Sequence, residues 1–402
     1  METVAPEDIG FSTDRLARVS ALTRRYVDGG KLAGTVTMLA RGGKTFHFEA
    51  AGAMDIEAGK PMELDTIFRI YSMTKPIASA AVMMLHEEGH FHLDDPVSTF
   101  IPELGDLQVC TGMGETGPKL SRLDRPITVR HLLTHTAGLS NGRSQDTPVD
   151  EMYRNSEPRR LEGTLRDMVT RLGELPLVSQ PGTRWRYSVA TDVLGYLVEV
   201  ISGQTFDRFL NERIFEPLGM RDTGFHVPEE KLARLPPVYG PSRESDIAPI
   251  ETDEVNRYRQ PQTLYSGAGG LVSTAADYMR FCQTLLSGGS SNGVQILGPK
   301  TVDLMTRNHL PPELMPYSTG EGWDTFTQGC GFGLGFKVVM DIAQYGVPGS
   351  AGAYSWGGAA NTFFWIDPAE ELVAILMTQF MPFLHYPIRS QFETATYQAL
   401  VS

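Results

Sequence analysis

The chain has 402 residues, of which 41% are hydrophobic and 21% charged, and these proportions are typical of an ordinary globular protein. Its 35 Lys and Arg residues stand against 48 Asp and Glu, and the resulting net charge of −13 argues against nucleic acid or an anionic membrane as a partner. A chain of this length exceeds the size at which a single hydrophobic core stops growing, so we expect two domains.

The cysteines and the N-terminus indicate a cellular compartment. Cys110, Cys282 and Cys330 are widely spaced and odd in number, so they predict neither a disulfide framework nor a metal site of the Cys-x-x-Cys type. The first ten residues carry acidic side chains where a secretory signal would carry Lys or Arg before an apolar run, and no apolar stretch of about 18 residues occurs anywhere. We therefore expect a cytoplasmic protein with reduced thiols.

The first elements are a helix and a hairpin. Ser12 or Thr13 can cap a helix whose apolar residues recur at helical spacing until Gly29-Gly30. Two β-rich runs follow, at residues 35–40 and 44–50, and the glycines between them predict a tight turn.

A serine and a lysine then stand three residues apart at the start of an apolar helix. Ser72-Met73-Thr74-Lys75 places both side chains on one helical face, and the helix that follows is too apolar to lie on the surface before it ends at Gly89. Burial and the helix N-terminus would both lower the pKa of Lys75, and a neutral amine could take the proton of Ser72. The alternative is a capping serine beside a solvated lysine.

The sequence of the middle third predicts short helices between loops rich in Gly and Pro. We predict helices at 128–134, 161–172 and 190–201, an irregular loop between 138 and 158, and a loop-rich segment at 222–250. This pattern is typical of a mainly helical domain.

The last third returns to alternating strands. After a helix at 274–286 we predict strands at 334–340, 353–356, 361–367 and 372–378 and a final helix at 388–400. With the early hairpin these strands predict an α/β (α+β) fold in which helices flank an antiparallel sheet. Residues 1–80 and 255–402 would form this α/β domain, and residues 81–254 would form the inserted helical domain, with the active site between the two.

Two further motifs compete with Ser72 for a functional role. Gly138-Leu139-Ser140-Asn141-Gly142 matches the G-x-S-x-G nucleophile motif, but it lacks the strand-to-helix turn which that motif needs. His86-Glu87-Glu88-Gly89-His90 matches the zinc motif H-E-x-x-H, but Gly89 should end the helix before both histidines share a face. His131 and His135, also four residues apart, are interpreted as packing or hydrogen-bonding residues. We expect no metal and no cofactor.

Several ordered motifs together resemble the serine β-lactamase and penicillin-binding-protein superfamily, above all the class C β-lactamase-like carboxylesterases called family VIII esterases. The resemblance covers nearly the whole chain and rests on these stretches: Ser72-Met73-Thr74-Lys75-Pro76, His131 to Leu139, Tyr187-Ser188-Val189, Phe215 to Met220, Gly269 to Ser273 and Trp356-Gly357-Gly358. It implies that Ser72 is the nucleophile and that Lys75 and Tyr187 share the general base and acid roles. It also implies that the backbone N–H groups of Ser72 and Ala359 form the oxyanion hole.

Two positions depart from the pattern of this superfamily. Val189 replaces the Asn of the Y-x-N motif, and Trp356 replaces the Lys of the K-T-G motif. Groups that orient the amide and the carboxylate of a β-lactam are therefore missing, as in the esterase branch. We expect Val189, Trp356, Gly357 and Gly358 to contact the substrate and to favour a small neutral ester.

The sequence thus predicts a serine carboxylesterase that forms an acyl-Ser72 intermediate on short-chain esters, with weak β-lactam hydrolysis at most. Two alternatives remain open from the residues alone. One is an acyltransferase on the same scaffold, which passes the acyl group to an alcohol. The other is a β-lactam or peptidoglycan binding protein that is acylated but hardly turns over.

Overall fold

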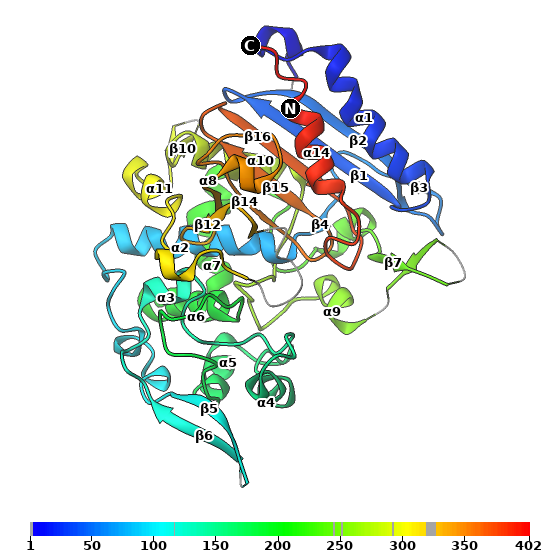
Figure 1. Ribbon diagram of the computed structural model, residues 1–402. Helices are drawn as coiled ribbons and strands as arrows, with labels where there is room; N and C mark the ends of the chain where they lie inside the picture. Colours follow the sequence, from blue (N-terminus) through cyan, green and yellow to red (C-terminus); the bar gives the residue numbers. More distant parts are fainter. Residues whose placement is uncertain (1–2, 116, 244–245, 251, 292, 319–326) are drawn as a thin grey trace.

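The structure is a computed structural model that describes residues 3–115, 117–243, 246–250, 252–291, 293–318 and 327–402. An eight-stranded antiparallel sheet forms its upper half (Figure 1). The strand order is β12-β13-β14-β15-β16-β1-β2-β3, so the two ends of the chain meet where β16 pairs with β1. The strands are β1 (Gly34–Arg41), β2 (Lys44–Asp55), β3 (Lys60–Pro61), β12 (Cys330–Phe332), β13 (Lys337–Val339), β14 (Tyr354–Gly357), β15 (Phe363–Asp367) and β16 (Leu372–Met377).

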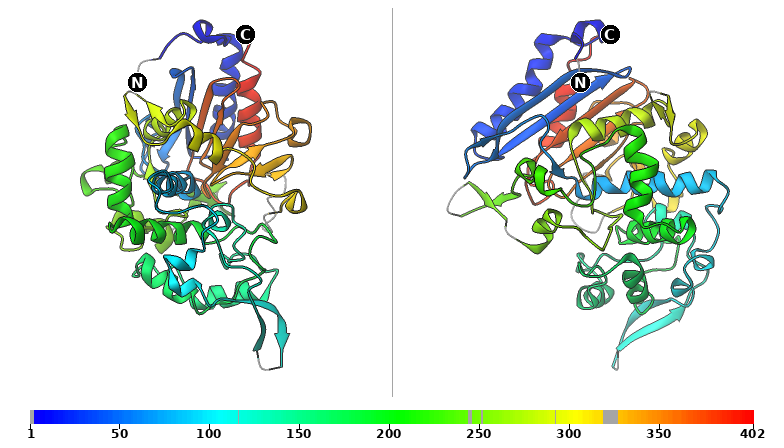
Figure 2. Two further views of the ribbon diagram at one scale, coloured as in Figure 1. Left: turned by 90° about the vertical axis from the view of Figure 1, so that its left-hand side faces the viewer. Right: turned by 180° about the vertical axis from the view of Figure 1, so that it is seen from behind.

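Helices cover both faces of this sheet. Helices α1 (Thr13–Asp28) and α14 (Ile388–Tyr397) pack on one face, and α10 (Ala275–Leu286) packs on the other (Figure 2). Every residue of β15 and β16 is therefore buried. This explains why their sequences are almost entirely apolar, apart from Asp367 at the end of β15, and do not alternate as a strand with one solvated face would.

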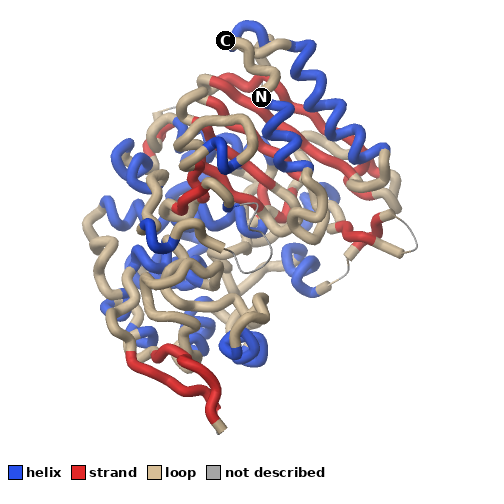
Figure 3. Tube along the Cα trace, viewed as in Figure 1, coloured by secondary structure: helices blue, strands red, loops and turns tan. Residues whose placement is uncertain are grey.

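The lower half of the molecule is mainly helical (Figure 3). It contains α3 (Val129–Leu133), α4 (Pro148–Ser156), α5 (Leu165–Leu172), α6 (Ala190–Ser202) and α7 (Phe206–Leu210). Helix α2 (Thr74–Glu87) runs between this half and the sheet, and it packs against α6. The predicted domain boundary at residues 80 and 81 falls inside α2, so this helix contributes to both halves.

Short elements connect these layers. They are β4 (Phe68–Arg69) paired with β9 (Val272–Ser273), β5 (Gln108–Gly114) with β6 (Gly117–Arg122), β7 (Tyr239–Pro241) with β8 (Ile247–Pro249), β10 (Ser290–Ser291) with β11 (Val294–Gln295), and the helices α8 (Glu216–Leu218), α9 (Asp253–Asn256), α11 (Pro299–Met305) and α13 (Ile342–Tyr345). Among the described residues, no helix combines the length and the apolar character needed to cross a membrane.

The structure confirms the predicted α/β class with its antiparallel sheet and corrects two details. The segment 138–158, predicted to be an irregular loop, contains α4, which begins with a capping box between Thr147 and Asp150. The region predicted to be helical also contains the β5–β6 hairpin, which projects from the bottom of the molecule in Figure 1. Glycines and exposed polar residues interrupt the alternation in this hairpin, and this weakens the sequence signal for strands.

Candidate active site

Ser72 lies on a sharp turn between a short strand and the buried helix α2. Strand β4 is held by β9, and the chain then turns through a single 3-10 turn at Tyr71–Met73. Tyr71 has a φ of 42°, in the left-handed region that residues other than glycine and asparagine rarely adopt. The turn is thus locally strained immediately before the serine, and the surrounding packing must hold it.

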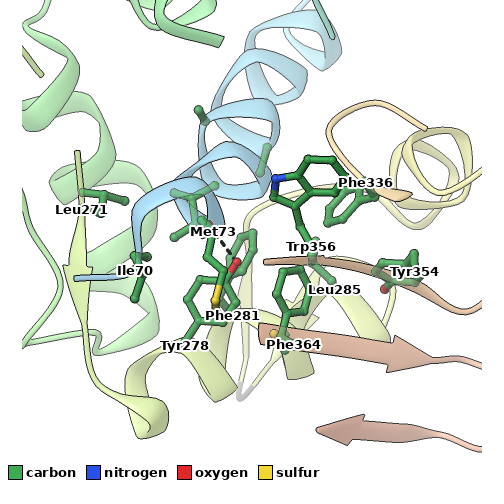
Figure 4. Close-up of a cluster of buried hydrophobic side chains, with 14 of the residues drawn as sticks. Ile70, Met73, Leu271, Tyr278, Phe281, Leu285, Phe336, Tyr354, Trp356 and Phe364 are labelled. Atoms are coloured by element: carbon green, nitrogen blue, oxygen red, sulfur yellow. Dashed lines mark hydrogen bonds between the residues drawn. The ribbon is translucent and has the colours of Figure 1, made fainter. Parts of the chain in front are cut away.

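That packing comes from the sheet and from α10. Figure 4 shows Ile70 and Met73 of the turn above Tyr278, Phe281 and other apolar side chains, all of them buried. The hydroxyl of Tyr278 donates to the backbone oxygen of Met73 at 2.9 Å. The base of the turn is therefore anchored in the hydrophobic core beside the sheet, while Ser72 itself is partly exposed.

Lys75 and Tyr187 both contact the Ser72 hydroxyl. The Lys75 Nζ lies 3.2 Å from the Ser72 Oγ, and the Tyr187 hydroxyl lies 2.7 Å from the same atom. The Lys75 Nζ also lies 4.5 Å from the centroid of the Tyr187 ring. Since Lys75 and Tyr187 are only 3% and 8% exposed, both groups approach the serine from the protein interior.

A third side chain, Asp192 on α6, organises the position of Lys75. The Lys75 Nζ donates to the backbone oxygen of Ala268 at 2.6 Å. The fully buried Asp192 carboxylate accepts from the Ala268 N–H at 2.9 Å and from the Ser266 hydroxyl at 2.6 Å. Sequence reasoning did not find Asp192, although an acidic residue in the first turn of a mostly apolar helix was a signal for it.

The turn after β14 approaches the Ser72 turn closely. A Cβ atom at Gly358 would lie 3.1 Å from the carbonyl carbon of Ile70 and closer still to its oxygen. Only glycine therefore fits there. The next residue, Ala359, lines the same cleft as Ser72. The N–H groups of Ser72 and Ala359 remain the predicted oxyanion donors.

The other predicted substrate contacts lie behind this cleft. Trp356 is buried on β14 (Figure 4). Its ring centroid lies 5.8 Å from that of Tyr187 and 5.4 Å from that of Phe332. Val189 is buried just before α6 begins. Neither these two nor Gly357 or Gly358 is among the described residues that line the cleft. In this structure Trp356 packs against Tyr187, and its contact with a substrate remains a prediction.

The cleft has a volume of about 330 Å³ and a strongly basic lining. Besides Lys75 it is lined by Arg143, Arg159 and Arg257, and none of the described lining residues is an Asp or a Glu. The sequence analysis considered only the lysine that Trp356 replaces, whereas these basic residues reach the cleft from other segments of the chain.

Ser140 and the H-E-x-x-H-like motif at residues 86–90 make their described contacts away from Ser72. The buried Ser140 hydroxyl donates to the Asp150 carboxylate at 2.5 Å, and that carboxylate also accepts from Arg186 at 2.7 Å. The His86 Nδ1 lies 2.9 Å from the backbone oxygen of Phe91, and the His90 Nε2 lies 3.5 Å from the Glu88 carboxylate. None of these contacts involves Ser72.

Two further histidines have structural contacts. His131 completes a capping box with Thr128 at the start of α3. His135 is buried 3.3 Å from the Ser188 hydroxyl, and its burial, with the nearby Lys75 charge, holds its pKa well below the usual value. Both side chains therefore act as the packing and hydrogen-bonding residues that the sequence predicted.

Comparisons with known proteins agree with this geometry. The sequence pattern of the family described as Beta-lactamase matches residues 19–393. Protein Rv1367c of Mycobacterium tuberculosis is 37% identical over 376 residues, which cover 90% of this chain and 89% of that protein. Esterase EstB of Burkholderia gladioli is 30% identical over 396 residues, which cover 94% of each chain. The solved structure titled "EstCE1, a hydrolase with promiscuous acyltransferase activity" has a TM-score of 0.81, is 28% identical, and covers 97% of this chain and 99% of that one.

Proposed function

Since the chain belongs to the beta-lactamase family of serine hydrolases, we propose that it is a carboxylesterase that hydrolyses short-chain esters through a covalent acyl-Ser72 intermediate. The observation that carries this proposal is the pair of hydrogen bonds at the Ser72 Oγ, one from Lys75 and one from Tyr187. A serine hydroxyl becomes nucleophilic only when a neighbouring base can accept its proton, and both candidate bases are in contact with it.

The proposed reaction has two stages. As the Ser72 Oγ forms a bond to the ester carbonyl carbon, its proton passes to the Lys75 and Tyr187 pair, and two backbone N–H groups stabilise the oxyanion. Collapse of this intermediate breaks the bond to the alcohol oxygen, which takes the proton as it leaves. Water then attacks the acyl-serine with the same pair as base, and the acid is released as Ser72 regains its proton.

Transfer of the acyl group to an alcohol is the second candidate activity. It is favoured by the similarity to EstCE1, a hydrolase with promiscuous acyltransferase activity. The two reactions share the acyl-enzyme and differ only in the acceptor that enters the cleft. Analysis of the products with and without an added alcohol separates them, since transfer yields a new ester in place of the free acid.

Labelling with a fluorophosphonate probe and peptide mapping tests the proposed nucleophile. We expect the label on Ser72, and we expect Ser72→Ala to lower kcat by about 10⁴-fold or more because the nucleophile is lost. Ser140→Ala is the matched control and should keep most of the activity, provided that it is folded. A label on Ser140, or full turnover by Ser72→Ala, would contradict the assignment.

A further inference from the structure

The segment that carries Tyr187 is held by the segment that contains the G-x-S-x-G motif. The Arg186 N–H donates to the backbone oxygen of His135 at 2.8 Å, and the Val189 N–H donates to the backbone oxygen of Ser140 at 3.3 Å. Tyr187 lies between these two attachments in the sequence. Its backbone is therefore held on both sides by a second segment of the chain.

The side chain of Arg186, the residue before Tyr187, forms a buried ion pair. Its Nη2 donates to the Asp150 Oδ1 at 2.7 Å. Arg186 is only 3% exposed, and Asp150 is fully buried. Asp146 supplies a second carboxylate, whose oxygens accept from Nη1 at 3.1 Å and from Nη2 at 2.7 Å. A buried guanidinium bound by two carboxylates has a well-defined orientation, so the ion pair fixes the position of Arg186.

Asp150 is itself fixed by the start of helix α4. It is the third residue of that helix, and its Oδ2 accepts from the N–H and the hydroxyl of Thr147 at 3.0 and 2.7 Å. The carboxylate therefore has one oxygen on the helix cap and the other on Arg186. The Ser140 hydroxyl also donates to Oδ1, but the ion pair and both Thr147 bonds remain when that hydroxyl is removed.

This network ends at a residue that contacts the proposed nucleophile. The Tyr187 hydroxyl lies 2.7 Å from the Ser72 Oγ, and proton transfer requires such a hydrogen-bonding distance. We propose that Asp150 and Arg186 are positioning residues, whose ion pair holds the 186–189 segment so that the Tyr187 hydroxyl meets the Ser72 Oγ. The inference rests on the proposed acyl-Ser72 mechanism, in which Tyr187 shares the role of the base.

A double-mutant cycle between Asp150 and Tyr187 tests this inference. The measured quantity is the second-order rate constant for fluorophosphonate labelling of Ser72, which depends on removal of the serine proton. We expect Asp150→Asn to lower this rate constant by about ten- to a hundredfold, because the charge that holds Arg186 is lost and Tyr187 is displaced. In the Tyr187→Phe background the same substitution should have little further effect, because the contact that Asp150 maintains is already absent.

A second variant and a matched control accompany the cycle. Arg186→Lys keeps the positive charge but loses the planar guanidinium, so it should behave like Asp150→Asn in both backgrounds. Asp167→Asn is the control, because Asp167 is the third residue of α5 and its Oδ2 accepts the same two bonds from Thr164, at 2.9 and 2.7 Å. It tests the loss of a capping carboxylate alone and should leave the labelling rate as in wild type. Circular dichroism and urea unfolding establish that each variant is folded.

The outcomes separate this inference from the proposed function. An equal loss of labelling rate in the wild-type and Tyr187→Phe backgrounds would overturn the inference, because the ion pair would then not act through Tyr187. Wild-type labelling rates in folded Asp150→Asn and Arg186→Lys would overturn it as well. Both results leave the esterase function intact. Failure of the unmodified protein to be labelled at Ser72, or an unchanged rate in Tyr187→Phe alone, would instead contradict the proposed mechanism.

Discussion

Asp192 is linked to Ser72, the proposed nucleophile, through one backbone segment and Lys75. Its carboxylate fixes Ser266 and Ala268, the oxygen of Ala268 fixes the Lys75 Nζ, and that nitrogen contacts the Ser72 Oγ. Asp192 acts on Ser72 only through Lys75 in this chain of contacts, so we propose that it is a positioning residue. The backbone oxygen beside Lys75 carries no charge, and it holds the Lys75 Nζ at hydrogen-bonding distance from the Ser72 Oγ.

We expect Asp192→Ala to lower both kcat and the rate of fluorophosphonate labelling of Ser72 by about ten- to a hundredfold, because two buried hydrogen bonds to the 266–268 segment are lost. Asp192→Asn keeps an acceptor oxygen and should recover most of the labelling rate. A purely structural role would lower the fraction of active protein but not the labelling rate of the folded molecules. A folded Asp192→Ala protein that is labelled as fast as wild type would contradict the positioning role.

At the scale of elements, the strongest local patterns predicted the structure well. Helix α2 and the strands β15 and β16 are long apolar runs with clear ends, and each lies close to its predicted range. Helix α4 was missed because its nine residues are short and mostly polar, so tertiary packing and a capping box decide its conformation. Strand β12 was missed because three residues carry no periodicity.

The residues of the candidate site also fall into two groups, those with a local sequence signal and those without one. The spacing of Ser72 and Lys75 is local and could be read from the chain, and Tyr187 came from a motif at the start of a helix. The arginines of the cleft could not be predicted, because Arg143, Arg159 and Arg257 meet only through the fold. Trp356 was placed in the substrate path by its motif. In the structure its side chain is buried beside Tyr187, and its contact with a substrate stays a prediction.

The turn after β14 and the Ser72 turn approach each other closely at Gly358. We expect Gly358→Ala to lower kcat severely and to destabilise the fold by about 1–3 kcal/mol, because a Cβ there would collide with the Ile70 carbonyl and separate the β14 turn from the Ser72 turn. Gly224→Ala is the control. A Cβ at Gly224 would have its nearest neighbour 3.7 Å away, so kinetics and urea unfolding should remain close to wild type. Near wild-type kinetics of Gly358→Ala would show that the approach is not required.

At the scale of the whole molecule, charged groups are buried beside the sheet as well as at the candidate active site. Lys337 on β13 is fully buried, and its Nζ lies 3.3 Å from the Tyr345 hydroxyl. The same hydroxyl accepts from Arg389 at 3.1 Å and donates to Glu393 at 2.7 Å, so α14 contributes one more cation and one carboxylate. Burial, and then the Arg389 charge, lower the pKa of Lys337 to about 7.

This depressed pKa makes stability depend on pH in a defined direction. In the unfolded chain Lys337 has an ordinary pKa near 10, so between about pH 7 and pH 10 the unfolded state binds a proton that the folded state does not. The contribution of Lys337 to the free energy of unfolding therefore rises with pH across this window, and it is least favourable below pH 7. Methionine has a similar length and no charge, so it removes this dependence.

We expect Lys337→Met to stabilise the protein most at pH 6.5, and the gain over wild type to fall by about 2 kcal/mol between pH 6.5 and pH 9. Urea unfolding of both proteins at several pH values measures this difference, and taking the difference removes the titration of groups that do not interact with Lys337. Lys300→Met makes the same chemical change at an exposed position of α11 and should give a difference that does not vary with pH. A gain for Lys337→Met that stays constant from pH 6.5 to pH 9 would mean that Lys337 keeps its proton in the folded protein. In that case the Glu393 carboxylate would have to compensate fully for the cost of burying the Lys337 ammonium.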